Sequence, residues 1–126
     1  MNEKLVQMSR DRKKAHKRLL DDLHSPVYAA FLDMERATYA DGALPKRIKE
    51  LVAVGISVAI DCHSCMQWHI EQAAEAGADP RQVLEAVEVG IEMGGGPATV
   101  SARFALEVMA DVFGEAALRE AGSQGA

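Results

Sequence analysis

A chain of 126 residues is most simply one domain, and its 48% hydrophobic and 5% aromatic content favours helices over sheets. The formal net charge of −5 argues against general nucleic-acid binding. The N-terminus is polar and basic without an apolar segment behind it, and the longest apolar stretch, residues 51–60, is too short to span a bilayer. We therefore expect a cytoplasmic protein with neither nucleic-acid nor membrane partners.

The N-terminal segment is basic. Residues 1–25 carry seven basic and four acidic side chains, so their balance is +3 and that of the remaining chain is −8. Acidic residues interrupt the run SRDRKKAHKR, a pattern typical of a solvated helix face or a flexible arm. We predict a basic helix or arm over residues 1–25.

Turn and capping residues divide the next part of the chain into helices. Ser25 can cap a helix that begins with Pro26 and runs to the Asp41-Gly42 break. Another helix begins at Pro45 and becomes apolar on nearly all sides from Leu51 onward. A helix of that kind is buried in a domain centre or at a subunit interface.

The second half of the chain continues in the same way. The segment that holds the cysteines reads as a helix ending at Gly77, which suits a left-handed cap. Asp79 and Pro80 then supply an N-cap and a first helical residue, and glycines at residues 94–96 break the helix that follows. A last helix is expected over about residues 98–113.

These elements predict an all-α fold of about six helices, because no segment alternates as a strand does. The predicted domain plan has three parts: a basic N-terminal helix or arm over residues 1–25, a core domain over residues 26–113, and a flexible C-terminal tail over residues 114–126.

The stretch DCHSCMQWH, residues 61–69, contains both cysteines and two of the four histidines. In a helix, residues three, four and seven apart share a face, so Cys62, Cys65 and His69 line one stripe when the helix begins near Asp61. His63 points about 100° away from Cys62. A neighbouring base or a helix N-terminus promotes the reactive thiolate. Cys65 has the base, since the His69 ring leans back toward it, and Cys62 has the helix start.

Three interpretations of this cluster remain open. A redox pair would attack an oxidant, form a sulfenic acid, condense to a disulfide and be reduced by an external dithiol. A metal site would combine Cys62, Cys65 and His69 with one outside carboxylate, although the second ligand pair usual for structural zinc is missing. The third is plain packing of a helical core. His16 and His24 lie outside the cluster and are expected at the surface.

The segment LPKRIKELVAVGISVAIDCHSCMQWHIEQAAEAGADPRQVLEAV resembles the carboxymuconolactone decarboxylase and alkylhydroperoxidase D superfamily. The redox branch of that superfamily carries a glutamate, a C-x-x-C pair twelve residues later, and a histidine four residues beyond the second cysteine. Glu50, Cys62, Cys65 and His69 stand at those spacings. The resemblance covers about residues 26–113.

The resemblance implies an all-helical domain that assembles into a homo-oligomer, a trimer or a hexamer. It implies that Cys65 attacks the peroxide, that Cys62 is the resolving partner met by the reductant, and that His69 and Glu50 form a proton relay, directly or through water. The partners would be a hydroperoxide and an external dithiol or a thioredoxin- or lipoyl-type protein. From the residues alone, Glu50 would instead be a solvent-exposed ion-pair partner of Lys46.

Two departures from the superfamily pattern matter. Alkylhydroperoxidase D has an extra histidine directly before the second cysteine, where this chain has Ser64, and His63 is only a candidate auxiliary residue. The decarboxylase branch lacks paired cysteines, so lactone decarboxylation is not expected. We therefore expect an alkylhydroperoxidase-like peroxidase or disulfide oxidoreductase without a cofactor or metal. The alternative is a non-catalytic metal-binding or redox-sensing protein that uses the same cluster.

Overall fold

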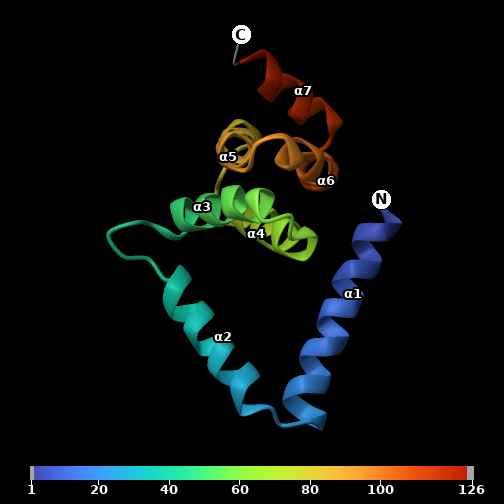
Figure 1. The fold of residues 1–126 in the computed structure, drawn as a ribbon, viewed down its shortest axis with the longest axis vertical. Helices are drawn as coiled ribbons and strands as arrows, with labels where there is room; N and C mark the ends of the chain where they lie inside the picture. Colours follow the sequence, from blue (N-terminus) through green and yellow to red (C-terminus); the bar gives the residue numbers. More distant parts are fainter. Residues whose placement is uncertain (1, 125–126) are drawn as a thin grey trace. The chain divides into compact units, whose positions relative to one another are not determined.

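The computed structural model describes residues 2–124, and every regular element in this range is a helix, which confirms the all-α prediction (Figure 1). The helices are α1 (Glu3–Lys17), the π-helical turn η1 (Arg18–Asp22), α2 (Pro26–Tyr39), α3 (Lys46–Ala59), α4 (His63–Glu75), α5 (Pro80–Gly94), α6 (Gly96–Phe113) and α7 (Glu115–Ser123).

The chain divides into two compact units, Met1–Asp41 and Gly42–Ala126. In the first unit, α1 and α2 diverge from the turn η1 (Figure 1). The hydroxyl of Ser25 accepts a hydrogen bond of 3.1 Å from the Tyr28 N–H, so Ser25 caps α2 as predicted. The division falls after Asp41 and not at residue 25, so α2 joins the basic helix instead of the second unit.

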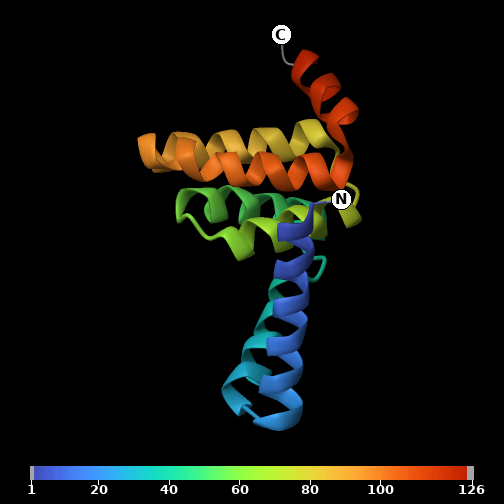
Figure 2. The ribbon, with the colours of Figure 1, turned by 90° about the vertical axis from the view of Figure 1, so that its right-hand side faces the viewer.

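The second unit is a bundle of α3 to α7. Helices α5 and α6 run side by side along the pair α3 and α4 (Figure 2), α3 packs against α4 and α5, and α7 packs against α5 and α6. Its core is made of buried aliphatic and methionine side chains, among them Val54, Val58, Met66, Ile70, Val83, Val87, Val108 and Met109. Removing these side chains from water supplies the main driving force for the bundle.

Helices α3 and α5 cross with their backbones in contact. A Cβ atom placed on Gly90 would lie 2.4 Å from the carbonyl oxygen of Gly55, and one on Gly55 would lie 3.0 Å from the carbonyl oxygen of Ala86. No side chain fits between helices at these distances, so the glycines are required for the close approach. This crossing fixes α3, the helix that carries Glu50.

The helix ends in the second unit follow the predicted capping residues. Asp79 and Gln82 form a reciprocal capping box, in which Asp79 Oδ1 accepts from the Gln82 N–H at 2.8 Å and Gln82 Oε1 accepts from the Asp79 N–H at 3.1 Å. Gly77 takes a φ of +99° after α4, and Gly95 takes +72° between α5 and α6.

The prediction of a flexible tail is wrong over Glu115–Ser123, where the chain forms α7. Gly114, at a φ of +88°, ends α6 and allows the chain to turn into α7. The segment is rich in Ala, Leu, Glu and Arg, which favour helix, and α7 packs against α5 and α6. Residues 125–126 of the predicted tail lie outside the described residues. Within residues 2–124, none of the helices is long and apolar enough to cross a membrane.

Candidate redox site

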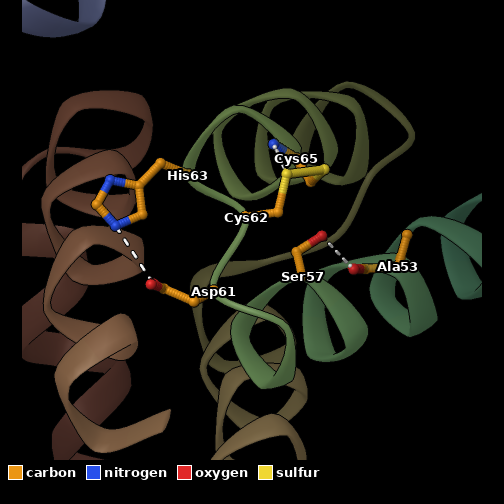
Figure 3. The surroundings of a disulfide bond; sticks show 6 residues. All are labelled: Ala53, Ser57, Asp61, Cys62, His63 and Cys65. Atoms are coloured by element: carbon orange, nitrogen blue, oxygen red, sulfur yellow. Dashed lines mark hydrogen bonds and ion pairs between the residues drawn. A yellow bond between two sulfur atoms is a disulfide. The ribbon is translucent and has the colours of Figure 1, made fainter. Parts of the chain in front are cut away.

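The two cysteines lie where the turn after α3 leads into α4, and they form a disulfide with Cα atoms 5.2 Å apart (Figure 3). Cys62 is the N-cap of α4, whose first helical residue is His63, and its Sγ accepts a hydrogen bond of 3.2 Å from the Cys65 N–H. Both cysteines are half-buried. The predicted proximity of the two sulfurs is therefore confirmed, and the Cys62 sulfur lies at the helix N-terminus, where a negative charge is stabilised.

The backbone of this turn is bonded to α3. The Cys62 N–H donates to the carbonyl oxygen of Ser57 at 3.0 Å, and the Asp61 N–H donates to that of Val58 at 3.3 Å. The buried Ser57 hydroxyl donates to the Ala53 carbonyl oxygen within its own helix at 2.6 Å (Figure 3). Cys62 is therefore held by backbone hydrogen bonds to the preceding helix.

Glu50 of α3 and His69 of α4 are in direct contact. His69 Nδ1 donates to Glu50 Oε1 at 2.7 Å, and the Glu50 side chain is only 1% exposed. The expected solvent exposure of Glu50 is therefore wrong: α3 turns this carboxylate into the bundle, beside α4. The pair needs no bridging water at this distance.

Lys46 provides the second partner of the buried carboxylate. Its Nζ lies 2.6 Å from Glu50 Oε2, one helical turn away along α3, and its own side chain is 40% exposed. Each oxygen of Glu50 thus has a charged or polar donor. A buried carboxylate is tolerable only when it is paired in this way.

His69 shares a face of α4 with Cys65, because the two residues are four apart in the same helix. The contact with Glu50 occupies Nδ1, so a neutral His69 ring that donates there presents its acceptor at Nε2. The structure therefore places Glu50 in contact with His69, and it places His69 on the face of α4 that holds Cys65. The disulfide joins Cys65 to Cys62.

His63 is not part of this arrangement. Figure 3 shows its ring pointing away from the two sulfurs, and the ring stacks on Phe104 of α6 with centroids 4.3 Å apart and planes 8° from parallel. Its Nε2 lies 3.4 Å from Asp61 Oδ1. Alkylhydroperoxidase D has an extra histidine directly before the second cysteine. His63 lies against α6 and therefore does not take the place of that histidine.

Sequence reasoning missed the contacts that α6 makes with the cysteine turn. The Ser101 hydroxyl donates to Asp61 Oδ1 at 2.8 Å, although the two residues are 40 apart in the chain. No local pattern marks Ser101 or Phe104, because an isolated serine and an isolated phenylalanine in an apolar helix are ordinary.

Within residues 2–124, no three His, Cys, Asp or Glu side chains gather as a metal site would require. His16 and His24 are exposed, as predicted.

The outer faces of α3 and α5 border an apolar groove of about 520 Å³. Val52 and Ile56 of α3 and Val89 and Met93 of α5 line it, and each of these side chains is between 52% and 75% exposed. The apolar surface of α3 after Leu51 is therefore partly in the core of the unit and partly open to solvent in the single chain.

The model of the carboxymuconolactone decarboxylase family matches residues 25–108. Two curated proteins are similar to the chain in sequence. Uncharacterized protein 4 in the cox locus of Paracoccus denitrificans is 39% identical over 85 residues, which cover 68% of this chain and 77% of that protein. An uncharacterized protein of Cupriavidus necator is 40% identical over 78 residues, which cover 62% of this chain and 69% of that protein.

Two solved structures have the same fold. The apo form of a carboxymuconolactone decarboxylase family protein from Legionella pneumophila superposes with a TM-score of 0.82 at 27% identity, over 90% of this chain and all 100% of that one. A carboxymuconolactone decarboxylase family protein from Thermotoga maritima gives a TM-score of 0.76 at 21% identity, over 94% of this chain and 95% of that one.

Proposed function

The chain belongs to the carboxymuconolactone decarboxylase family, and we propose that it is a thiol-dependent peroxidase or disulfide oxidoreductase that cycles through Cys62 and Cys65. The observation that carries the proposal is a disulfide at the start of α4, on the same helix as a histidine that is bonded to a buried glutamate. A carboxylate, an imidazole and a thiol in this order are the groups that activate a nucleophile and return its proton.

The first step is oxidation of Cys65. His69 takes the thiol proton through Nε2, and Glu50 stabilises the imidazolium through Nδ1. The Cys65 thiolate attacks one oxygen of the hydroperoxide, the O–O bond breaks, and the sulfur becomes a sulfenic acid. The departing alkoxide takes the proton from His69 and leaves as an alcohol.

The second step closes the disulfide. The Cys62 sulfur attacks the sulfenic sulfur of Cys65, the S–O bond breaks, and the hydroxyl leaves as water with the Cys62 proton. The oxidised pair is the state seen in the structure. The short separation of the two Cα atoms, 5.2 Å, is within the range that a disulfide needs.

The third step is reduction by an external dithiol, such as a thioredoxin- or lipoyl-type protein of a reducing cytoplasm. A reductant thiol gives its proton to His69 and attacks Cys62 as a thiolate, and Cys65 leaves as a thiolate that takes this proton from His69. The second reductant thiol then releases Cys62 and forms the reductant's own disulfide. The net reaction converts a hydroperoxide and a dithiol into an alcohol, water and a disulfide.

We also propose that the protein works as a homo-oligomer in which the groove between α3 and α5 faces another copy. Contiguous exposed apolar side chains on two adjacent helices are typical of an interface between proteins. This proposal follows the expectation of a trimer or hexamer.

The experiment that tests the redox function is an intact-mass measurement with a thiol count. Reduced, metal-free protein is measured before and after one equivalent of cumene hydroperoxide. We expect the loss of two hydrogen atoms and of both thiols within seconds, reversed by a dithiol. Unchanged thiols would exclude peroxide as the oxidant. Thiols that exchange with a disulfide reagent but do not react with peroxide would exclude the peroxidase and support the disulfide oxidoreductase.

The same protein preparation distinguishes the proposed redox function from the metal-binding alternative. If the reduced chain binds one zinc ion and the metal protects both thiols from the hydroperoxide, a metal-binding or sensing role replaces catalysis.

A further inference from the structure

Helix α6 holds the residues on both sides of Cys62. The Ser101 hydroxyl donates to Asp61 Oδ1 at 2.8 Å, and the His63 ring stacks on Phe104. Ser101 and Phe104 are three residues apart in α6, so they lie on one face of the helix. The redox cysteine at the helix start is therefore flanked by two residues that are each anchored to another helix.

Asp61 takes a backbone conformation that needs such an anchor. Its φ is +55°, in the left-handed region that residues with a side chain rarely adopt. Such conformations persist only when the surrounding structure enforces them. The Ser101 hydroxyl can enforce this conformation of Asp61, because Ser101 is only 5% exposed and its hydroxyl donates to Asp61 from a buried position. His63 Nε2 adds a contact of 3.4 Å to the same carboxylate oxygen.

The two cysteines differ in how they are held. Cys65 lies within the first turn of α4, and its backbone is fixed by the helix. Cys62 is the N-cap, where the chain enters the helix with φ −99° and ψ 99°. Outside the helical ladder, the freedom of Cys62 therefore depends on its own hydrogen bond to the Ser57 carbonyl oxygen and on the contacts made by its two neighbours. Restricting that freedom in the dithiol state makes closure of the ring more favourable, because less entropy is lost when the sulfurs join.

We propose that Ser101 and Phe104 are positioning residues that, through Asp61 and His63, set the equilibrium between the dithiol and the disulfide of Cys62 and Cys65. The proposal rests on the redox role of the pair in the proposed function, but not on peroxide as the oxidant. The equilibrium concerned is the exchange of the reduced pair with glutathione disulfide, which gives the protein disulfide and two glutathione thiols.

The test is the equilibrium constant of that exchange, measured for the full chain across mixtures of reduced and oxidised glutathione. The pair is quenched and alkylated, and its two states are counted by intact mass. Ser101→Ala removes the donor, and we expect the constant for disulfide formation to fall about three- to tenfold, the size typical of one lost hydrogen bond. Ser101→Thr keeps a hydroxyl and restores most of the wild-type value.

Two further variants make the result specific. Thr99→Val is the matched control, because the exposed Thr99 hydroxyl donates only to Gly96 within α6, at 2.6 Å, and its loss leaves the constant unchanged. Phe104→Leu retains bulk but removes the ring that stacks on His63, and we expect a decrease in the same direction as for Ser101→Ala. Helical circular dichroism and thermal unfolding are recorded for every variant.

A merely structural role would lower the thermal stability of Ser101→Ala and Phe104→Leu and leave the glutathione equilibrium within about twofold of wild type, a change below that of one hydrogen bond. That outcome overturns the inference and leaves the proposed function intact. Absence of any exchange with glutathione in the wild-type protein overturns both. Loss of peroxide turnover alone affects only the proposed function.

Discussion

His69 Nδ1 lies 2.7 Å from Glu50 Oε1, although 19 residues separate the two in the chain. The contact connects α3 with α4 and places a carboxylate that is 1% exposed behind the imidazole. A buried carboxylate in this position fixes the orientation of the imidazole ring.

Replacing Glu50 with Gln retains the shape of the side chain and removes its charge. We expect peroxide-dependent turnover to fall about 10²-fold or more, the usual contribution of a general base and its orienting group. The measurement is the steady-state rate with cumene hydroperoxide and a dithiol. Glu75→Gln is the control, because Glu75 is an exposed residue of α4 whose carboxylate accepts a long hydrogen bond of 3.5 Å from Gln72 Nε2. Equal rates in both variants would remove Glu50 from the mechanism.

Lys46 compensates the buried charge of Glu50 across 2.6 Å. Lys46→Met leaves one carboxylate oxygen without this donor, and we expect the free energy of unfolding to fall by about 1–3 kcal/mol. Urea denaturation followed by circular dichroism measures it. Arg36→Met is the control, since the Arg36–Asp33 pair is 70% and 74% exposed. An exposed pair contributes under about 1 kcal/mol. Equal losses in the two variants would show that burial of Glu50 does not matter to stability.

The positions of the helices could largely be predicted because each boundary depends on local chemistry. Ser25 and Asp79 accept hydrogen bonds from the helix that follows them, and Gly77 supplies a positive φ. The tail from residue 114 is wrongly predicted as flexible because it ends in the small and polar residues AGSQGA, which are typical of a frayed chain end. In the structure, packing against α5 and α6 stabilises α7, and nothing in the local sequence reveals that contact.

The site was predictable only in part, for a related physical reason. Cys65 and His69 lie within one helix that Cys62 caps, so the helical period places Cys65 and His69 on one face. Lys46 stands one helical turn before Glu50, and this sequence spacing is the same whether the glutamate side chain is exposed or buried. Its burial depends on how α3 packs on α4. The hydrogen bond from Ser101 to Asp61 spans 40 residues and has no periodic signal at all.

Single cysteine substitutions separate the roles of the two sulfurs. Cys65→Ser removes the sulfur on the face of His69, and we expect it to abolish peroxide turnover. Cys62→Ser leaves one oxidation of Cys65 but stops cycling, because no partner can resolve the sulfenic acid. Trapping with dimedone followed by intact mass shows this sulfenic acid in Cys62→Ser only. Full dithiol-dependent turnover by Cys65→Ser would show that the nucleophile is assigned to the wrong sulfur.

The crossing of α3 and α5 predicts a strong effect of a single methyl group. A Cβ on Gly90 would lie 2.4 Å from the Gly55 carbonyl oxygen, so Gly90→Ala must push the helices apart. We expect a loss of about 1–3 kcal/mol or more in the free energy of unfolding. Gly122→Ala is the matched control in a helix, because the added carbon would meet no atom within 4 Å apart from its chain neighbours and the backbone of its own helix. It should stabilise the chain by about 0.5–1 kcal/mol, and a similar loss in both variants would contradict the crossing.

The proposed assembly depends on the groove between α3 and α5, where Val52 is 52% exposed. Val52→Glu introduces a charge that would have to be desolvated against another copy, so we expect light scattering after size exclusion to give a smaller mass than the multimer of the wild type. Val100→Glu is the matched control, because Val100 is 53% exposed on α6 and does not line the groove. A wild-type protein that elutes as a monomer refutes the assembly. A Val52→Glu variant with the wild-type mass places the contact elsewhere, since a buried carboxylate without a partner would not be tolerated in this groove.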